Sequence, residues 1–138
     1  MHGGTILKLL DQVAYACASR YSGSYVVTLS VDKVNFKEPI HVGELVTFLA
    51  SVNHVGRTSM EIGIRVEAQN IQKRTVRHTN SCYFTMVAVD EQGKPKQIPG
   101  LNLDNDWKRC RFEAAEHRKI ARLSENHHPS CSIYKKSV

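Results

Sequence analysis

The sequence has 138 residues and a mass of 15.6 kDa, which suits one globular domain and leaves little room for two. The formal net charge is +6. With 41% hydrophobic and 23% charged residues, the composition excludes disorder over most of the chain. No stretch approaches the roughly 18 uncharged apolar residues of a membrane span, and Lys8 and Asp11 interrupt the N-terminal apolar run, which argues against a signal peptide.

The cysteines are spaced far apart and form no C-x-x-C pair. They are Cys17, Cys82, Cys110 and Cys131. This spacing supports neither a disulfide scaffold nor a zinc site. It predicts free thiols in a reducing compartment, and we therefore expect a cytoplasmic protein that binds no metal.

Residues 5–22 are expected to form a helix, with Thr5 near its cap and Gly23 just after its last turn. Its apolar residues are Ile6, Leu7, Leu9, Leu10, Val13, Ala14, Tyr15, Ala16, Cys17 and Ala18. A helix that is apolar around most of its circumference is typical of a protein core. We therefore expect this helix to be buried on most sides.

Long segments with strand patterns follow, at residues 25–36, 44–52, 60–68 and 75–90. In the first of them, alternation predicts one shared face for Val27, Leu29 and Val31. The phase then changes, which predicts a bulge near Asp32 and Lys33. Gly56 and Arg57 are typical of a hairpin turn between the second and third strands.

Residues 105–122 are expected to form a second helix, mostly charged, that lies on a surface. The residues that can share its apolar face are Trp107, Cys110, Ala114 and Ala121. We expect one domain over residues 1–123 and a flexible basic tail over 124–138, in which His127 and His128 are inert. The fold class is α+β, with a long antiparallel sheet curled around the first helix.

Asp11 is unusual because it lies in the most apolar segment of the chain. Carboxylates are rarely buried without a partner, and a buried one would suit a general base or a nucleophile. The other interpretation is that Asp11 reaches solvent or a salt bridge at an edge. The sequence leaves both open.

His2, Gly3 and Gly4 lie directly before the apolar helix. Glycines let a ligand approach the backbone, and free N–H groups at a helix start can polarise a carbonyl as an oxyanion hole does. An ordinary turn is the alternative. Asp11 is two turns further on, roughly 10–12 Å by helical rise, so it can serve a partner subunit's site as readily as its own.

The segment HGGTILKLLD at residues 2–11 resembles the helix-start motif of hotdog-fold acyl-CoA thioesterases of the cytosolic acyl-CoA hydrolase type. VDKVNF at 31–36, followed by PIHVGE at 39–44, resembles that family's second strand and loop, and VGRTSM at 55–60 resembles its next hairpin. The resemblance runs in order from about residue 2 to residue 122. It implies a hotdog fold, in which an antiparallel sheet wraps around one long helix, with a surface helix at the C-terminus.

The resemblance also implies a function, the hydrolysis of fatty acyl-CoA to a fatty acid and CoA. Asp11 would be the general base or nucleophile, and backbone N–H groups near His2, Gly3 and Gly4 would hold the thioester oxygen. The stretch that would border the CoA site is Gly56, Arg57, Thr58 and Ser59. No metal or cofactor is needed, because CoA is part of the substrate and a thioester is already activated.

In the family an asparagine just upstream of the His-Gly-Gly motif positions the thioester, and no residue of this sequence matches it. The resemblance therefore predicts one of two things. The first is an N-terminally shortened form, whose location can be an organelle as well as the cytoplasm. The second is a catalytically impaired protein that binds acyl-CoA or CoA. The family also builds its site across a dimer interface, often within a trimer of dimers. We therefore expect self-association.

Six basic residues cluster in the second helix: Lys108, Arg109, Arg111, Arg118, Lys119 and Arg122. Arg109 and Arg111 are candidates for contacts with the CoA phosphates, although a solvated helix face explains most of the six. Trp107 can stack on adenine or anchor the helix to the sheet. A basic nucleic-acid-binding module is the remaining alternative, but no sequence signature of one is present, and we expect no nucleic-acid partner and no membrane insertion.

Overall fold

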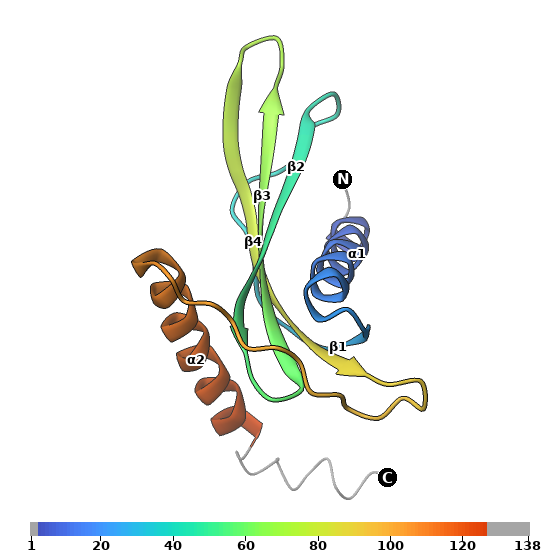
Figure 1. Ribbon diagram of the computed structural model, residues 1–138. Helices are drawn as coiled ribbons and strands as arrows, with labels where there is room; N and C mark the ends of the chain where they lie inside the picture. The colour runs from blue at the N-terminus through green and yellow to red at the C-terminus, as the bar shows by residue number, and fades with distance from the viewer. Residues whose placement is uncertain (1–2, 127–138) are drawn as a thin grey trace, which may run out of the picture. The chain divides into compact units, whose positions relative to one another are not determined.

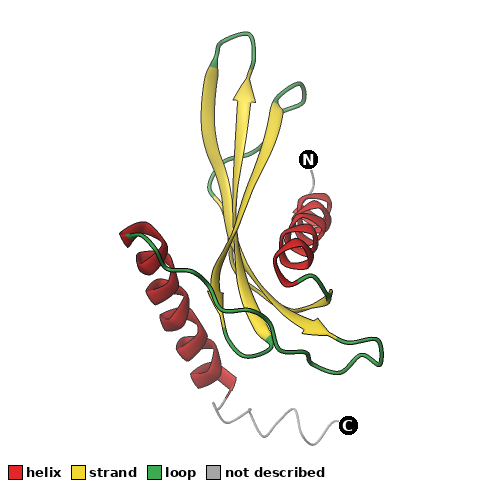
Figure 2. Ribbon diagram, viewed as in Figure 1, coloured by secondary structure: helices red, strands yellow, loops and turns green. Residues whose placement is uncertain are grey.

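The computed structural model describes residues 3–126, which form two helices and one sheet (Figures 1 and 2). The elements are α1 (Gly3–Ser22), β1 (Tyr25–Phe36), β2 (Leu45–Val55), β3 (Ser59–Asn70), β4 (Thr75–Val89) and α2 (Asp106–Asn126). The chain forms two compact units that divide between Asn102 and Leu103. His2 and most of the expected tail over 124–138, namely the part from residue 127 with its two histidines, lie outside the described residues. None of the helices within residues 3–126 is long and apolar enough to cross a membrane.

The four strands form one antiparallel sheet in the order β1-β4-β3-β2, so β1 and β2 are its edges. The hairpin predicted at Gly56 is present between β2 and β3, where the Gly56 N–H donates to the Ser59 carbonyl at 2.8 Å. The second hairpin joins β3 to β4 beyond the pair Asn70 and Thr75. The α+β class and the antiparallel sheet are therefore confirmed.

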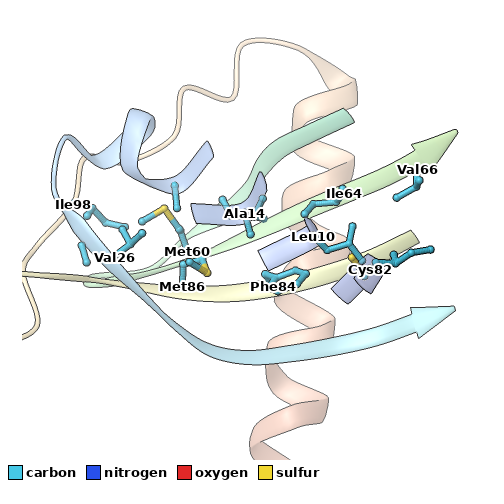
Figure 3. Close-up of a cluster of buried hydrophobic side chains, with 14 residues drawn as sticks. Leu10, Ala14, Val26, Met60, Ile64, Val66, Cys82, Phe84, Met86 and Ile98 are labelled. Atoms are coloured by element: carbon cyan, nitrogen blue, oxygen red, sulfur yellow. The ribbon is translucent and has the colours of Figure 1, made fainter. Parts of the chain in front are cut away.

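α1 lies along one face of the sheet, and this contact forms the hydrophobic core (Figures 1 and 3). Its buried residues recur every fourth position, at Ile6, Leu10, Ala14 and Ala18. They pack against alternate residues of the two central strands, namely Met60, Ile62, Ile64, Val66, Cys82, Phe84, Met86 and Ala88. The sequence places one apolar residue per helical turn opposite every second residue of each strand, which is the pattern that a helix on a sheet requires.

The prediction that α1 is buried on most sides is wrong for the single chain. Leu7 remains 38% exposed and Tyr15 remains 45% exposed. The physical reason is that one sheet can cover only one side of a helix, so the remaining apolar residues of α1 face outward. Apolar side chains left exposed on a helix are typical of a surface that another molecule covers.

β1 carries the bulge that the sequence predicts. The pairing with β4 shifts between Asp32 and Asn35, and Lys33 there has a φ of 51°. A non-glycine residue in the left-handed region is uncommon and fits the extra residue of a bulge. The change of hydrophobic phase in the sequence was therefore a correct signal.

A second bulge in β1 contradicts the expected alternation of its apolar residues. Leu29 has no pairing partner on β4, while Val27 pairs with Val87 and Val31 pairs with Phe84. Val87 and Phe84 are an odd number of residues apart, so their side chains point to opposite faces of the sheet. Val27 and Val31 therefore lie on opposite faces, and the prediction that they share one face with Leu29 is wrong.

α2 belongs to the second compact unit and has a capped N-terminus, where Asn105 Oδ1 accepts the Lys108 N–H at 2.8 Å. The prediction of its apolar face is wrong, because Trp107, Cys110, Ala114 and Ala121 are all exposed. The buried residue is Ala115, which is 1% exposed, and Phe112 one turn before it is half-buried. The buried side of α2 is therefore shifted by one residue from the predicted apolar face. It has too few apolar residues to stand out among the charged residues of the helix.

The loop before β2 is fastened to β4 by Arg77. The Arg77 guanidinium donates to Glu38 Oε2 at 2.7 Å and to Glu44 Oε1 at 2.6 Å. The Glu44 side chain is only 7% exposed, and its hydrogen bond from Arg77, helped by one from the His41 N–H, lowers the pKa of its carboxyl group. A carboxyl whose pKa is lower in the folded than in the unfolded protein stabilises the fold above its unfolded pKa, and this stability is lost as the pH falls.

Replacing Arg77 with methionine is therefore expected to flatten the acid end of the stability profile. The melting temperature of the parent should fall more steeply than that of Arg77→Met as the pH drops below about 4.5, the ordinary pKa of glutamate. Thermal unfolding measured between neutral and acidic pH tests this. The matched control is Arg65→Met, which removes an exposed pair with Glu67. Parallel curves for the parent and Arg77→Met would contradict the interpretation.

Candidate active site

Asp11 lies halfway along α1 on a side of the helix that is exposed in the single chain. Its Oδ1 accepts a hydrogen bond of 2.6 Å from Oγ1 of Thr28 on β1. Of the two possibilities that the sequence left open, the structure shows the exposed one, with a neutral hydroxyl as partner in place of a salt bridge. A carboxylate held through one oxygen in this way keeps its orientation while its other oxygen remains available for chemistry.

Thr28 is a site residue that the sequence analysis did not single out. It pairs with Met86, and its hydroxyl also lies 3.4 Å from Met86 Sδ. Val26 and Thr28 both point toward α1, because their partners Ala88 and Met86 are core residues. The sequence offered no signal for Thr28, because it alternates with the apolar residues of this strand and its direction follows only from the pairing with β4.

The glycines occupy the first turn of α1. A Cβ atom on Gly3 would lie 3.9 Å from Cζ of Phe36, and one on Gly4 would have no atom within 4 Å. The first N–H groups of a helix have no partner within the helix and carry partial positive charge. Within one chain Asp11 is about 12 Å further along the helix axis than Gly3, so these groups and the carboxylate do not meet at one reacting atom.

Measured along the strands of the sheet, the hairpin stretch Gly56–Ser59 lies far from Gly3 and Gly4 but at the same height as Asp11. Phe36, beside Gly3, pairs with Asn80, whereas the Thr58 carbonyl accepts the Ala88 N–H at 3.0 Å. About eight residues of β4 separate these two levels, which corresponds to roughly 26 Å.

Ser59 pairs with Val87, and Thr28 pairs with the adjacent Met86. β1 and β3 flank β4, so the hairpin and the Asp11–Thr28 pair are about two strand spacings, or roughly 10 Å, apart across the sheet. The structure therefore brings the hairpin stretch near Asp11 and not near the glycines of the same chain.

The two candidate arginines lie in the second compact unit. Arg109 donates to Asp106 Oδ1 at 2.6 Å and to the Leu103 carbonyl at 3.1 Å. The Arg111 guanidinium lies over the Trp107 ring, 4.7 Å from its centroid, and the tryptophan is 65% exposed. Their predicted contact with CoA stays a prediction.

Two cavities of about 820 Å³ each lie within the first unit, and no predicted site residue lines either of them. One is formed by the loop before β2 and the β3–β4 hairpin, including Glu44, Lys73 and Arg77. The other lies between α1 and β2, including Val13, Cys17 and Val52. In the single chain, Asp11 is therefore on an open surface outside both.

The two thiols of the first unit are unsuited to nucleophilic chemistry at neutral pH. Burial raises the pKa of the Cys82 thiol to about 12, and burial also raises the pKa of Cys17. These two thiols are poor nucleophiles at neutral pH, because the thiolate is the reactive form. Within residues 3–126, no group of three or more His, Cys, Asp and Glu side chains is placed to hold a metal ion.

The sequence model of the thioesterase superfamily matches residues 1–75 of the chain. The chain belongs to the thioesterase superfamily.

Individual relatives agree with this assignment. The thioesterase is 55% identical to protein VdlD of Helicobacter pylori over 122 residues, which cover 88% of this chain and 70% of that protein. It is 35% identical to the cytosolic acyl coenzyme A thioester hydrolase of Mus musculus over 124 residues, 87% of this chain but only 32% of the mouse protein. The resemblance stated from the helix-start and strand motifs is therefore confirmed.

Solved structures confirm the hotdog fold. A hexameric acyl-CoA thioesterase in its apo form superimposes with a TM-score of 0.89 at 36% identity, covering 94% of this thioesterase and 83% of that chain. An acyl-CoA hydrolase of Staphylococcus aureus matches with TM-scores of 0.79 and 0.80 at 31% identity, covering 91% of this chain and 82% or 80% of that one. The latter structures are variants with alanine in place of a threonine and of an aspartate.

Proposed function

We propose that this thioesterase hydrolyses fatty acyl-CoA to a free fatty acid and CoA, with Asp11 as the reacting carboxylate. The observation that carries the proposal is the exposed Asp11 carboxylate held by Thr28 in a chain of this superfamily. The names of the mouse relative and of the hexameric solved structure support acyl-CoA as the substrate class.

In the proposed reaction, Asp11 acts on the thioester carbonyl carbon in one of two ways. As a general base it takes a proton from water while the water oxygen forms the new C–O bond. As a nucleophile it forms an anhydride that water then cleaves. In both cases the C–S bond breaks, CoA leaves as the thiolate and takes up a proton, and the acid keeps one oxygen from water.

The N–H groups at Gly3 and Gly4 are the proposed donors to the thioester oxygen, with His2 beside them in the sequence. Charge develops on this oxygen in the transition state, and fixed donors aimed at it stabilise that state most. Because Asp11 lies about 12 Å along the same helix, the proposed active site combines the helix start of one copy with the Asp11 of another.

The free edge of β1 is the proposed contact between copies. Within residues 3–126, β1 is an edge strand with unpaired backbone groups on its outer side. Its exposed large apolar residues are Tyr25, Val27, Leu29, Val31 and Phe36, which are 68%, 50%, 64%, 40% and 49% exposed. Pairing of two β1 edges would continue the sheet and cover these side chains. The hexameric solved neighbour is consistent with such dimers assembling further.

The CoA part of the substrate is proposed to lie along Gly56–Ser59. Turn N–H groups, hydroxyls and a guanidinium are suitable phosphate donors, and the hairpin is level with Asp11. We also propose a cytoplasmic location, because Cys17, Cys82 and Cys110 are free thiols.

Release of CoA thiol from acyl-CoA by the purified protein tests the proposal. Acyl chains of short, medium and long length should be compared, and the released acid should be quantified beside the thiol. We expect equal amounts of thiol and acid. Tight binding of CoA without thiol release would show a binding protein and would overturn the proposed hydrolysis.

Removing the Thr28 hydroxyl should slow the reaction by loosening Asp11. A hydrogen bond to a charged group contributes about 1.5–3 kcal/mol, so Thr28→Val is expected to lower kcat roughly 10- to 100-fold. Thr28→Ser keeps the hydroxyl and should remain close to the parent. Equal kcat values for the valine and serine variants would exclude a role of this hydrogen bond in hydrolysis.

A further inference from the structure

Among residues 3–126, Asn80 on β4 is a buried side chain whose amide group has no hydrogen-bond partner. Its side chain is 1% exposed, and neither Oδ1 nor Nδ2 makes a hydrogen bond within residues 3–126. Leaving such a group unpaired costs free energy, and native proteins rarely retain one without a reason. The adjacent Thr79 shows the ordinary solution, because its equally buried hydroxyl donates to the Val66 carbonyl at 3.2 Å.

The pairing of β4 shows which way Asn80 points. It is directly opposite Phe36 on β1, and directly opposed residues carry their side chains on the same face. Phe36 approaches Gly3 of α1 on that face. Asn80 is also in phase with Cys82 and Phe84, which contact α1 in the core.

The first turn of α1 therefore lies on the face of the sheet that Asn80 and Phe36 share. Its backbone N–H groups are free of intrahelical partners and favour an oxygen that carries negative charge. Gly3 and Gly4 place no Cβ atom between this turn and its surroundings, and the Phe36 ring, 49% exposed, is the side chain that approaches Gly3. A helix start and an unpaired buried amide thus converge on one place from two elements.

We propose that the Asn80 amide is a second donor to the thioester oxygen, acting together with the first-turn N–H groups of α1. Substrate would displace the Phe36 ring and give Asn80 Nδ2 the acceptor that it lacks. This inference rests on the proposed hydrolysis of acyl-CoA and adds a binding residue to that site. It also explains the unpaired amide as a group retained for function at some cost in stability.

Asn80→Leu separates this role from a structural one. Leucine matches the amide in size and removes both unpaired atoms, so the melting temperature should stay the same or rise. Loss of one donor to a developing oxyanion should lower kcat roughly 10²-fold, with KM nearly unchanged because the interaction is strongest in the transition state. The measurements are acyl-CoA hydrolysis at varied substrate concentration and thermal unfolding.

Thr79→Val is the matched control, because it removes a buried hydroxyl that has its partner within the fold. It should lower the melting temperature and leave kcat at the parental value. If Asn80→Leu does not fold, Asn80→Ser decides the question, since a smaller side chain loses the amide without crowding the core. A folded Asn80 variant with parental kcat would overturn the inference while leaving the proposed function intact, whereas an inactive parent chain would overturn the proposed function itself.

Discussion

Replacing Asp11 with asparagine is expected to lower kcat for acyl-CoA hydrolysis about 10³-fold, because the variant keeps the size of the side chain but can neither accept a proton nor attack a carbonyl. Asparagine still offers an oxygen to the Thr28 hydroxyl, so the local structure should be retained. Release of CoA thiol under saturating substrate, beside a thermal unfolding curve, checks both points.

Gln12→Ala is the matched control for this variant. Gln12 is the next residue of α1 and is also exposed, but it carries no ionisable group. Parental kcat is expected for Gln12→Ala. A loss of less than tenfold in Asp11→Asn, or an equal loss in both variants, would remove Asp11 from the reacting position.

Introducing acidic residues on the free edge of β1 should both separate the copies and abolish hydrolysis. The double change Val27→Glu and Leu29→Glu puts acidic groups where two edges would meet, so like charges would oppose pairing. We expect a monomer by light scattering and a loss of hydrolysis of more than about 10²-fold, because the monomer cannot bring Asp11 to the helix start of another copy.

Val42→Glu controls for the effect of adding acidic charge to an exposed apolar position. Val42 is fully exposed in the loop before β2. This variant should keep both the assembly and the activity of the parent. A β1 double variant that remains assembled, or a monomer with full activity per chain, would show that β1 is not the functional interface.

The elements of the fold could be predicted from the sequence because each has a strong periodic pattern. The bulge at Lys33 shows as a change of phase in the sequence. The bulge at Leu29 does not, since the alternation of Val27, Leu29 and Val31 with polar residues continues across it. The burial of α1 was overestimated for a different reason. A helix has apolar residues wherever another surface covers it, whether that surface belongs to the same chain or to another copy. The sequence does not distinguish burial within one chain from burial in an assembly.

The position of Asp11 could be predicted, but its surroundings could not. A lone carboxylate in an apolar helix stands out in the sequence, whereas Thr28 is one of many threonines until the pairing of β1 shows that it points at α1. Asn80 could not be predicted for the same reason, because the face of the sheet on which its side chain lies depends on the register of β4. The level of Gly56–Ser59 relative to Asp11 likewise follows from strand pairing, which links residues far apart in the chain.

Restoration of activity by mixing two inactive variants tests most directly the claim that one active site is built from two copies. Asp11→Asn removes the carboxylate, and Gly4→Pro removes an N–H from the first helical turn, where proline is tolerated. Co-expressed with different tags and purified through both, the mixed assembly contains sites in which neither defect is present. We predict that thiol release returns to a substantial fraction of the parental rate, at most about half in paired copies. Activity no higher than that of the better single variant would contradict a shared site.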